Sequence, residues 1–222
     1  MCLNNWGGID HKVLEFHEYV NLFSGKSGSG KSTVMDAIQV ILYGSFSPSF
    51  LNKAADDAKN RRSVLSYLRG EQKDGSANRK DCDFCSVIAL EIEDTGTHII
   101  TCIGIAFEVR KSDSEIKKFV YFSHSGKMPE SEYLTEQGVC YSNQEIKKLV
   151  SARTKSDDNR GKGEVNRIYG SKEAYLGTLY DVILGYIDQN RFITMEKSAI
   201  ALKMTNGTGQ FIRDYMFPKN TS

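Results

Sequence analysis

The sequence has almost no net charge and no long apolar run. Its 29 Lys and Arg residues nearly balance 28 Asp and Glu residues, which leaves a formal net charge of +1. Such a chain has no overall electrostatic attraction for nucleic acid or an acidic membrane surface, so any such site must be a local patch. The sequence has neither an apolar stretch that could span a bilayer nor a basic and then apolar signal peptide at its start. We therefore expect a cytoplasmic protein with no membrane partner.

Paired cysteine motifs are also missing. The five cysteines are an odd number without a secretion signal, which indicates reduced thiols. Cys82 and Cys85 form an isolated C-x-x-C pair, but a zinc site needs a second pair or suitably spaced histidines. His98 and His124 do not provide that spacing. Buried or partly exposed thiols near the start of a strand are therefore favoured over zinc or redox chemistry.

Repeats, low-complexity tracts and heptad patterns are absent from the sequence as well. The hydrophobic fraction of 40% and the charged fraction of 26% are typical of a globular protein. A chain of 222 residues can form one large domain or two small ones.

What the sequence does contain is a complete phosphate-binding motif. Residues 25–32 read Gly-Lys-Ser-Gly-Ser-Gly-Lys-Ser, which fits the P-loop pattern G-x-x-x-x-G-K-[ST]. Residues 19–23 before it are predicted as a short apolar strand, and apolar residues recur at helical spacing over 34–42 after it. An ordinary Gly/Ser-rich turn is the alternative, but strand, loop and helix stand in the order that phosphate binding requires.

Each part of this motif has a predicted role. The glycines let the backbone N–H groups form a nest for phosphate oxygens, and the helix N-terminus adds partial positive charge. Lys31 is the predicted catalytic lysine on the β- and γ-phosphates, Ser32 a Mg²⁺ ligand and Thr33 a donor to the α-phosphate. The predicted cofactor-binding residues of this segment are Gly25, Lys26, Ser27, Gly28, Ser29, Gly30, Lys31, Ser32 and Thr33.

The rest of the chain divides into a β-rich and a helix-rich part. Residues 1–6 and 11–16 are predicted as a hairpin around Gly7-Gly8, and residues 58–69 as a short helix followed by a loop over 71–83. An antiparallel meander is expected from the β-branched and aromatic residues of three segments. These segments are 84–92, 98–109 and 117–122.

Two later helices are predicted from their caps. Ser142 and Glu145 form a capping box for one helix, and Ser171 caps the next. Between them, residues 153–163 are rich in charge and contain glycine, which predicts a solvated loop. The second helix is expected to bury an apolar face. Its predicted members are Ala174, Leu176, Leu179, Val182, Ile183 and Tyr186.

Several of these segments resemble the start of SMC-type ATPase heads. The resembling segments within residues 3–70 are 5–8, 16–18, 24–33 and 35–39. The Asn-Trp-Gly opening resembles the bacterial condensin branch, with MukB-like proteins and the ATP-binding subunit of Wadjet plasmid-defence systems. Residues 50–55 and 66–70 look most like the Wadjet-type group, and 211–215 resembles the segment leading into the coiled coil.

The resemblance implies that the chain has the α/β fold of a P-loop NTPase of ABC/SMC-head type. A mixed sheet would surround the P-loop helix beside an antiparallel β layer. Residues 1–222 would be the N-terminal portion of a split head, with a P-loop core at 1–70, a meander at 84–122 and a helical part at 142–217. In such heads the leading hairpin helps to hold the nucleotide base, which makes Asn5 a cofactor-binding candidate. Trp6 is either part of that layer or a core aromatic.

The resemblance also implies function and partners. The expected ligands are ATP and Mg²⁺. The expected partners are the C-terminal half of the same head, a second head, DNA and a kleisin-like subunit. ATP hydrolysis by the completed dimer would drive DNA engagement in a condensin-like complex, with plasmid defence as one possible role. Clustered Lys53, Arg61, Arg62 and Arg69 are the candidates for a DNA-facing or phosphate-facing patch.

The parts that hydrolysis requires beyond the P-loop are not found. Phosphoryl transfer needs a carboxylate that holds Mg²⁺ and a residue that positions the attacking water. In SMC heads the Asp-Glu pair and the Ser-Gly-Gly signature lie in the second half of the head. Residues 182–188 imitate an apolar strand ending in Asp188, but their flanks predict a continuing helix. We therefore expect the isolated chain to bind nucleotide weakly and to be inactive.

Two further site assignments come from the resemblance. Gln189 is the nearest candidate for the glutamine that contacts the metal, although the family match at 199–203 would place that loop later. Arg61, with Arg62 as its neighbour, is a candidate to reach the γ-phosphate; a solvated helix face is the alternative.

Two other functions remain open from the sequence. One is a self-contained P-loop phosphotransferase acting on a small molecule, with residues 153–163 as its lid. The other is a P-loop protein that binds nucleotide as a structural switch without turnover.

Overall fold

The computed structural model describes residues 1–16, 31–47, 63–72, 74–158 and 165–185. Within them, six strands form one sheet with the order β2-β1-β3-β4-β5-β6. The strands are β1 (Cys2–Trp6), β2 (Ile9–Val13), β3 (Phe84–Glu93), β4 (Ile100–Val109), β5 (Lys118–Ser125) and β6 (Arg167–Tyr169). The helices are α1 (Lys31–Tyr43), α2 (Val64–Arg69), α3 (Asn143–Asp158), α4 (Lys172–Gly177) and the π-helix η3 (Thr178–Ile183).

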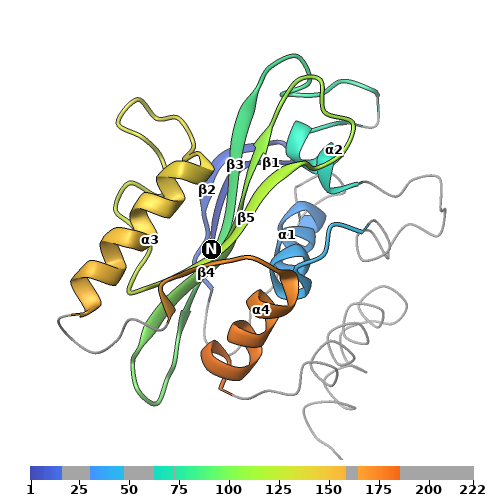
Figure 1. Cartoon of the computed structure of the whole chain (residues 1–222). Helices are drawn as coiled ribbons and strands as arrows, with labels where there is room; N and C mark the ends of the chain where they lie inside the picture. Colours follow the sequence, from blue (N-terminus) through green and yellow to red (C-terminus); the bar gives the residue numbers. More distant parts are fainter. Residues whose placement is uncertain (17–30, 48–62, 73, 159–164, 186–222) are drawn as a thin grey trace, which may run out of the picture.

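Helices cover both faces of the sheet (Figure 1), with α3 on one face and α1 and α4 on the other. The strands alternate between two hydrophobic clusters, because successive side chains point to opposite faces. Leu3, Ile88 and Ile105 pack on the α1 side, while Val87 and Ala106 pack on the α3 side. Two buried faces explain why β4 is buried at nearly every position, unlike a strand of an antiparallel sheet with one solvated face.

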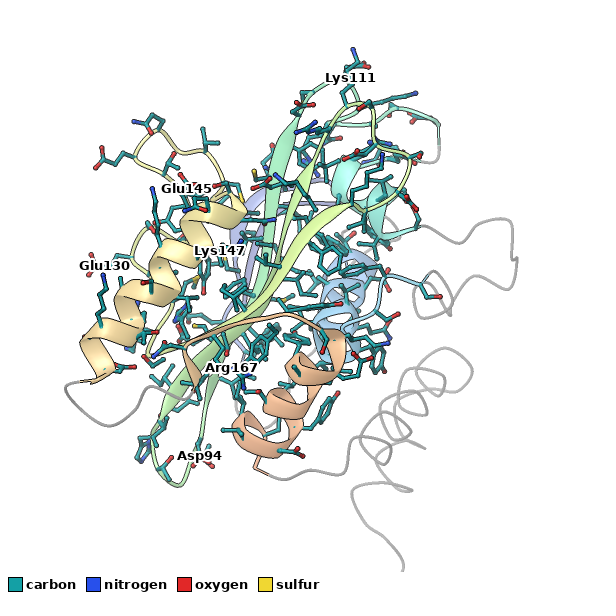
Figure 2. The ribbon with its side chains drawn as sticks, in the orientation of Figure 1. Asp94, Lys111, Glu130, Glu145, Lys147 and Arg167 are labelled. Carbon is teal, nitrogen blue, oxygen red and sulfur yellow. The ribbon has the colours of Figure 1, made fainter. Side chains whose placement is uncertain are left out.

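The predicted hairpin and meander are confirmed, with shifted limits. The Gly7-Gly8 turn joins β1 to β2, which begins at Ile9, earlier than expected. The second meander strand begins at Ile100 because His98 has a φ of +56° within the preceding turn. That turn, at Asp94, lies at the opposite end of the sheet from Lys111 between β4 and β5 (Figure 2).

The described sheet is antiparallel at every pairing. The predicted mixed sheet depends on the P-loop strand at 19–23, which lies outside the described residues. The structure therefore shows an α/β arrangement with a six-stranded antiparallel sheet in the described part of the chain. The short strand β6, at the end of that sheet, was not predicted from the sequence.

Helix α3 confirms the capping box and corrects the loop that was predicted after it. The Ser142 backbone N–H donates to Glu145 Oε2 at 2.6 Å, and the Glu145 N–H donates to Ser142 Oγ at 3.3 Å. The helix then continues to Asp158, through the first part of the predicted loop 153–163. Arg153 donates to two backbone carbonyls, and Asp157 is buried and accepts from the Ser125 hydroxyl. These tertiary contacts extend a segment whose composition alone indicates a solvated loop.

The helix capped by Ser171 is also confirmed, but the prediction is wrong for some of the residues on its buried face. Leu176 and Leu179 are buried, whereas Ala174 and Val182 are exposed. The chain changes at Thr178 from an α-helix to a π-helix, whose wider turn shifts a face predicted from a 3.6-residue period. Tyr175 and Tyr180 occupy the buried positions instead. The helical geometry through Ile183 confirms that 182–184 is not the end of an apolar strand, while Asp188 lies outside the described residues.

A buried histidine joins β5 to the loop before α3. His124 Nδ1 lies 3.0 Å from the Ser125 carbonyl oxygen, and Nε2 lies 2.8 Å from the Tyr133 hydroxyl. Since a carbonyl can only accept, Nδ1 carries the proton and Nε2 accepts from Tyr133. Burial lowers the pKa of His124 to about 4. The folded protein therefore holds a neutral imidazole.

Because the folded protein holds His124 neutral, we expect it to lose stability at acid pH. Between about pH 6.5 and pH 4 the unfolded chain binds a proton at His124 that the folded protein does not, so the contribution is intact above pH 6.5 and falls as the pH falls. The expected loss is about 3 kcal/mol in the free energy of unfolding. Urea unfolding from pH 7 to pH 4 should show a shallower pH dependence for His124→Gln than for the parent. The control is His98→Gln, because the His98 side chain is 78% exposed; an equally shallow dependence in both variants would contradict the assignment to His124.

Candidate nucleotide site

The predicted phosphate-binding segment ends on the first turn of α1. Lys31, Ser32 and Thr33 form the first turn of that helix within the described residues. Asn5 lies on β1, and the remaining predicted members of the site lie outside the described residues. These are Gly25, Lys26, Ser27, Gly28, Ser29, Gly30, Arg61 and Gln189. The structure therefore describes the residues that pack around the start of α1.

The hairpin turn between β1 and β2 sits directly on this first turn. Trp6 is completely buried, and its indole N–H donates to the Thr33 carbonyl oxygen at 2.8 Å. Gly7 has a φ of +58°, and a Cβ atom added there would lie 2.5 Å from the Thr33 Cγ2 atom. Only glycine meets both conditions without strain. Trp6 is thus a core aromatic, as the alternative to base stacking predicted.

Helix α2 holds the same region from a second direction. The Tyr67 hydroxyl donates to a carboxylate oxygen of Asp36, which is buried on α1. The Tyr67 ring stacks on Trp6, with ring centroids 5.0 Å apart and planes inclined by 5°. The Gly7 N–H donates to the Tyr67 carbonyl oxygen at 2.7 Å. The start of α1, the hairpin turn and α2 therefore form one hydrogen-bonded unit.

Arg79 completes this unit from the loop after α2. Its side chain is buried, and it donates to the Gly7 carbonyl, to the Leu68 carbonyl at 2.8 Å and to Asp10 Oδ1 at 3.0 Å. Burial lowers the pKa of the guanidinium, and the nearby Asp10 carboxylate partly offsets this. The sequence of the predicted loop 71–83 does not indicate that Arg79 is buried, because a single arginine among polar residues is usually solvated.

Asn5 and Arg69 were predicted to face the nucleotide or DNA. The Asn5 amide donates to the Cys85 carbonyl oxygen on β3 at 2.8 Å, and its backbone has a φ of +54°. The Arg69 guanidinium, predicted to point outward, donates to the carbonyls of three residues between β4 and β5, namely Arg110, Lys111 and Asp113. Both side chains thus have partners in the sheet, and Arg69 is corrected from a solvated charge to a contact within the fold.

The cysteines are free thiols, as expected. Cys82 is exposed and Cys85 is partly buried, and burial raises the pKa of Cys85 to about 11. Among the described residues, His, Cys, Asp and Glu side chains form no group of three or more that could hold a metal ion. Cys85, the second residue of β3, is a partly buried thiol near the start of a strand.

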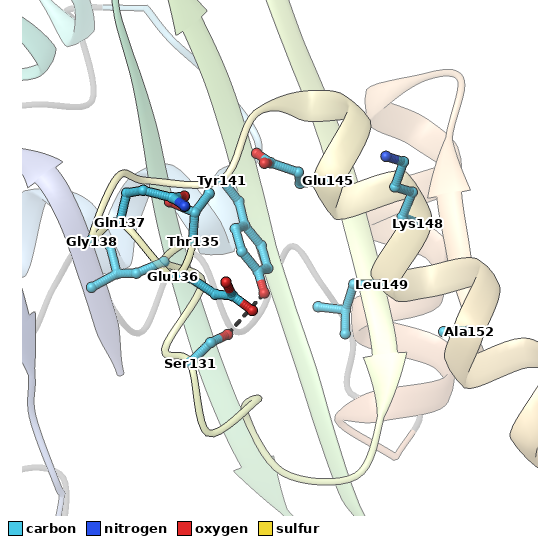
Figure 3. A pocket seen from close by; sticks show the side chains of 11 residues that line it. Ser131, Thr135, Glu136, Gln137, Gly138, Tyr141, Glu145, Lys148, Leu149 and Ala152 are labelled. Carbon is cyan, nitrogen blue, oxygen red and sulfur yellow. Dashed lines mark hydrogen bonds between the residues drawn. The ribbon is translucent and has the colours of Figure 1, made fainter.

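A groove lies elsewhere, between α3 and the loop before it (Figure 3). It has a volume of about 920 Å³, and its lining includes Glu145 and Lys148 of α3. A hydrogen bond of 2.9 Å between Ser131 and Tyr141 closes one side. Among the described residues, Asn5 and Thr33 of the predicted nucleotide site do not line this groove.

Comparison with known families gives one match. A family model described as the P-loop containing region of AAA domain matches residues 1–58. The chain matches none of the curated proteins. The matched range includes the β1–β2 hairpin, the predicted P-loop and α1, and it supports a P-loop NTPase and nucleotide binding. No helix in the described ranges has the length and apolar character needed to cross a membrane.

The close approach at Gly7 leads to a stability prediction. Gly7→Ala should lower the free energy of unfolding by roughly 1–3 kcal/mol, because the new Cβ meets Thr33 and alanine disfavours a positive φ. Gly8→Ala is the matched control, since its Cβ would come no nearer than 3.8 Å to the Gln72 Nε2 atom. Chemical denaturation of the two variants measures the difference, and equal stabilities would contradict the described contact.

Proposed function

We propose that this chain binds ATP with Mg²⁺ through residues 25–33 and forms the N-terminal portion of a split SMC-type ATPase head. The observation that carries the proposal is the complete P-loop motif ending on the first turn of α1, with the β1–β2 hairpin seated on that turn. The family match over residues 1–58 supports the nucleotide-binding part. The SMC-specific part rests on the resemblance of the sequence within residues 3–70.

The chemistry of the proposed site follows from the motif. Lys31 places a positive charge on the terminal phosphates, and Ser32 supplies a hydroxyl ligand for Mg²⁺. Thr33 donates to the α-phosphate, while its carbonyl remains bonded to Trp6. Arg61 and Gln189 are proposed additional contacts to the γ-phosphate and the metal. Bound Mg²⁺ would neutralise charge that develops on the phosphates.

Hydrolysis in this proposal belongs to a composite site. The C-terminal half of the head would supply the Mg²⁺ carboxylate and the catalytic base, and a second head would supply the signature segment. DNA and a kleisin-like subunit are the further proposed partners. Since Arg69 donates to carbonyls between β4 and β5, the proposed DNA-facing patch is reduced to Lys53, Arg61 and Arg62.

A small-molecule phosphotransferase is the competing proposal. Its lid was expected at residues 153–163, with an arginine to cover the phosphates. Residues 153–158 are part of α3, and Arg153 donates to the Ser125 carbonyl at 2.9 Å and the Lys127 carbonyl at 3.2 Å. This arginine therefore serves the fold, and the lid proposal loses the arginine that the structure describes in this segment.

Nucleotide binding is tested by one substitution. Lys31→Ala should abolish detectable binding of Mg²⁺-ATP while the protein remains folded, because alanine suits a helix and only the charge on the phosphates is lost. Lys12→Ala is the matched control, since Lys12 is an exposed lysine of β2 in the same hairpin layer. Isothermal titration calorimetry of parent and variants measures the affinities. Equal affinities of the parent and Lys31→Ala would contradict the P-loop assignment.

The split-head proposal predicts the activity of the isolated chain. Loss of one stabilising group in an active site typically costs about a hundredfold to a thousandfold in rate, and residues 1–222 would lack several. Phosphate release from ATP should therefore be at background for the chain alone and should appear when the C-terminal half of the head is added. Robust activity of the chain alone with a small-molecule acceptor would favour the phosphotransferase. Hydrolysis by the chain alone that Asp188→Asn abolishes would make Asp188 the metal carboxylate.

A further inference from the structure

Tyr67 contacts both the β1–β2 turn and helix α1, beside the first turn of that helix. Tyr67 is 2% exposed, its ring stacks on Trp6, and its hydroxyl donates to Asp36 on α1. Its backbone carbonyl accepts the N–H of Gly7. The hairpin turn and the helix are thus connected to each other through Tyr67, in addition to their direct contact between Trp6 and Thr33.

The position of Asp36 on α1 determines how its hydrogen bond with Tyr67 affects the orientation of that helix. Asp36 follows Ser32 by four residues, and residues four apart lie on the same side of an α-helix. A hydrogen bond at Asp36 therefore restrains the rotation of α1 about its own axis, and with it the direction of the backbone at Lys31 and Ser32. Phosphate contacts depend on placement to within about 1 Å.

We propose that Tyr67 is a positioning residue for nucleotide binding, which acts by holding Asp36 and Trp6 so that the first turn of α1 faces the phosphates. This inference rests on the proposed nucleotide site. The Tyr67 side chain does not belong to the P-loop and is not assigned to touch the nucleotide. It acts through the orientation of α1, so its loss lowers affinity without removing any predicted ligand contact.

A matched control lies near the C-terminal end of α1. Tyr175 is completely buried, and its hydroxyl donates to the Ile41 carbonyl oxygen at 2.7 Å. Tyr67→Phe and Tyr175→Phe therefore each remove one buried hydroxyl bonded to α1. The first lies beside the turn that bears Lys31, and the second lies near the C-terminal end at Tyr43. A general effect on stability would be shared by the two variants, whereas an effect on positioning would not.

The experiment measures two quantities on the 222-residue chain. Thermal unfolding without nucleotide reports stability, and calorimetric titration with Mg²⁺-ATP reports affinity. We expect both variants to lower the melting temperature, Tyr67→Phe by more because its hydroxyl bonds a buried carboxylate. Only Tyr67→Phe should weaken Mg²⁺-ATP binding, by about fivefold, which corresponds to one net hydrogen bond. Trp6→Phe, which keeps an aromatic ring beside Tyr67 but loses the donor to Thr33, should also weaken binding and serves as the second variant if Tyr67→Phe does not fold.

The outcomes separate this inference from the proposed function. Parent affinity in Tyr67→Phe, or an equal loss in Tyr67→Phe and Tyr175→Phe, overturns the positioning role while leaving the nucleotide site intact. If Tyr67→Phe does not fold, parent affinity in Trp6→Phe overturns it. A parent protein that binds Mg²⁺-ATP no better than Lys31→Ala overturns the proposed function, and the inference with it.

Discussion

The close approach of the β1–β2 turn to the first turn of α1 is the constraint on which the nucleotide face depends. Gly7 leaves no room for a side chain against Thr33, and the indole of Trp6 bonds the carbonyl of the same threonine. Tyr67 and Arg79 then hold that turn through its backbone N–H and carbonyl. Since a backbone carbonyl and N–H have fixed directions, these contacts define the orientation of the turn and of the helix beneath it.

The sequence predicts those features that depend on residues close together in the chain. The Gly7-Gly8 turn, the three meander strands and the capping box of Ser142 and Glu145 all follow from local spacing, and all are present. The P-loop assignment rests on spacing as well, and the family match over residues 1–58 supports it. Local turn chemistry and period-two patterns carry this information because they act over two to four residues.

The features that the sequence did not predict depend on contacts between distant residues. Asp36 and Tyr67 are 31 positions apart, and Arg79 bonds Gly7 across 72 positions. The extension of α3 through Asp157 depends on its burial against Ser125 and Asn166, which composition cannot show. The π-helical turn after α4 changed which residues are buried, since the predicted face assumed a constant helical period.

Three arginines show most clearly why charge patterns alone mislead about function here. Arg69, Arg79 and Arg153 stand in polar stretches that indicate solvent, DNA or phosphate as partners, yet each donates to backbone carbonyls at turns and helix ends. A guanidinium carries five N–H donors in a fixed fork, which suits it to turns that expose several carbonyls at once. The positive charges of these three arginines are therefore committed to contacts within the fold.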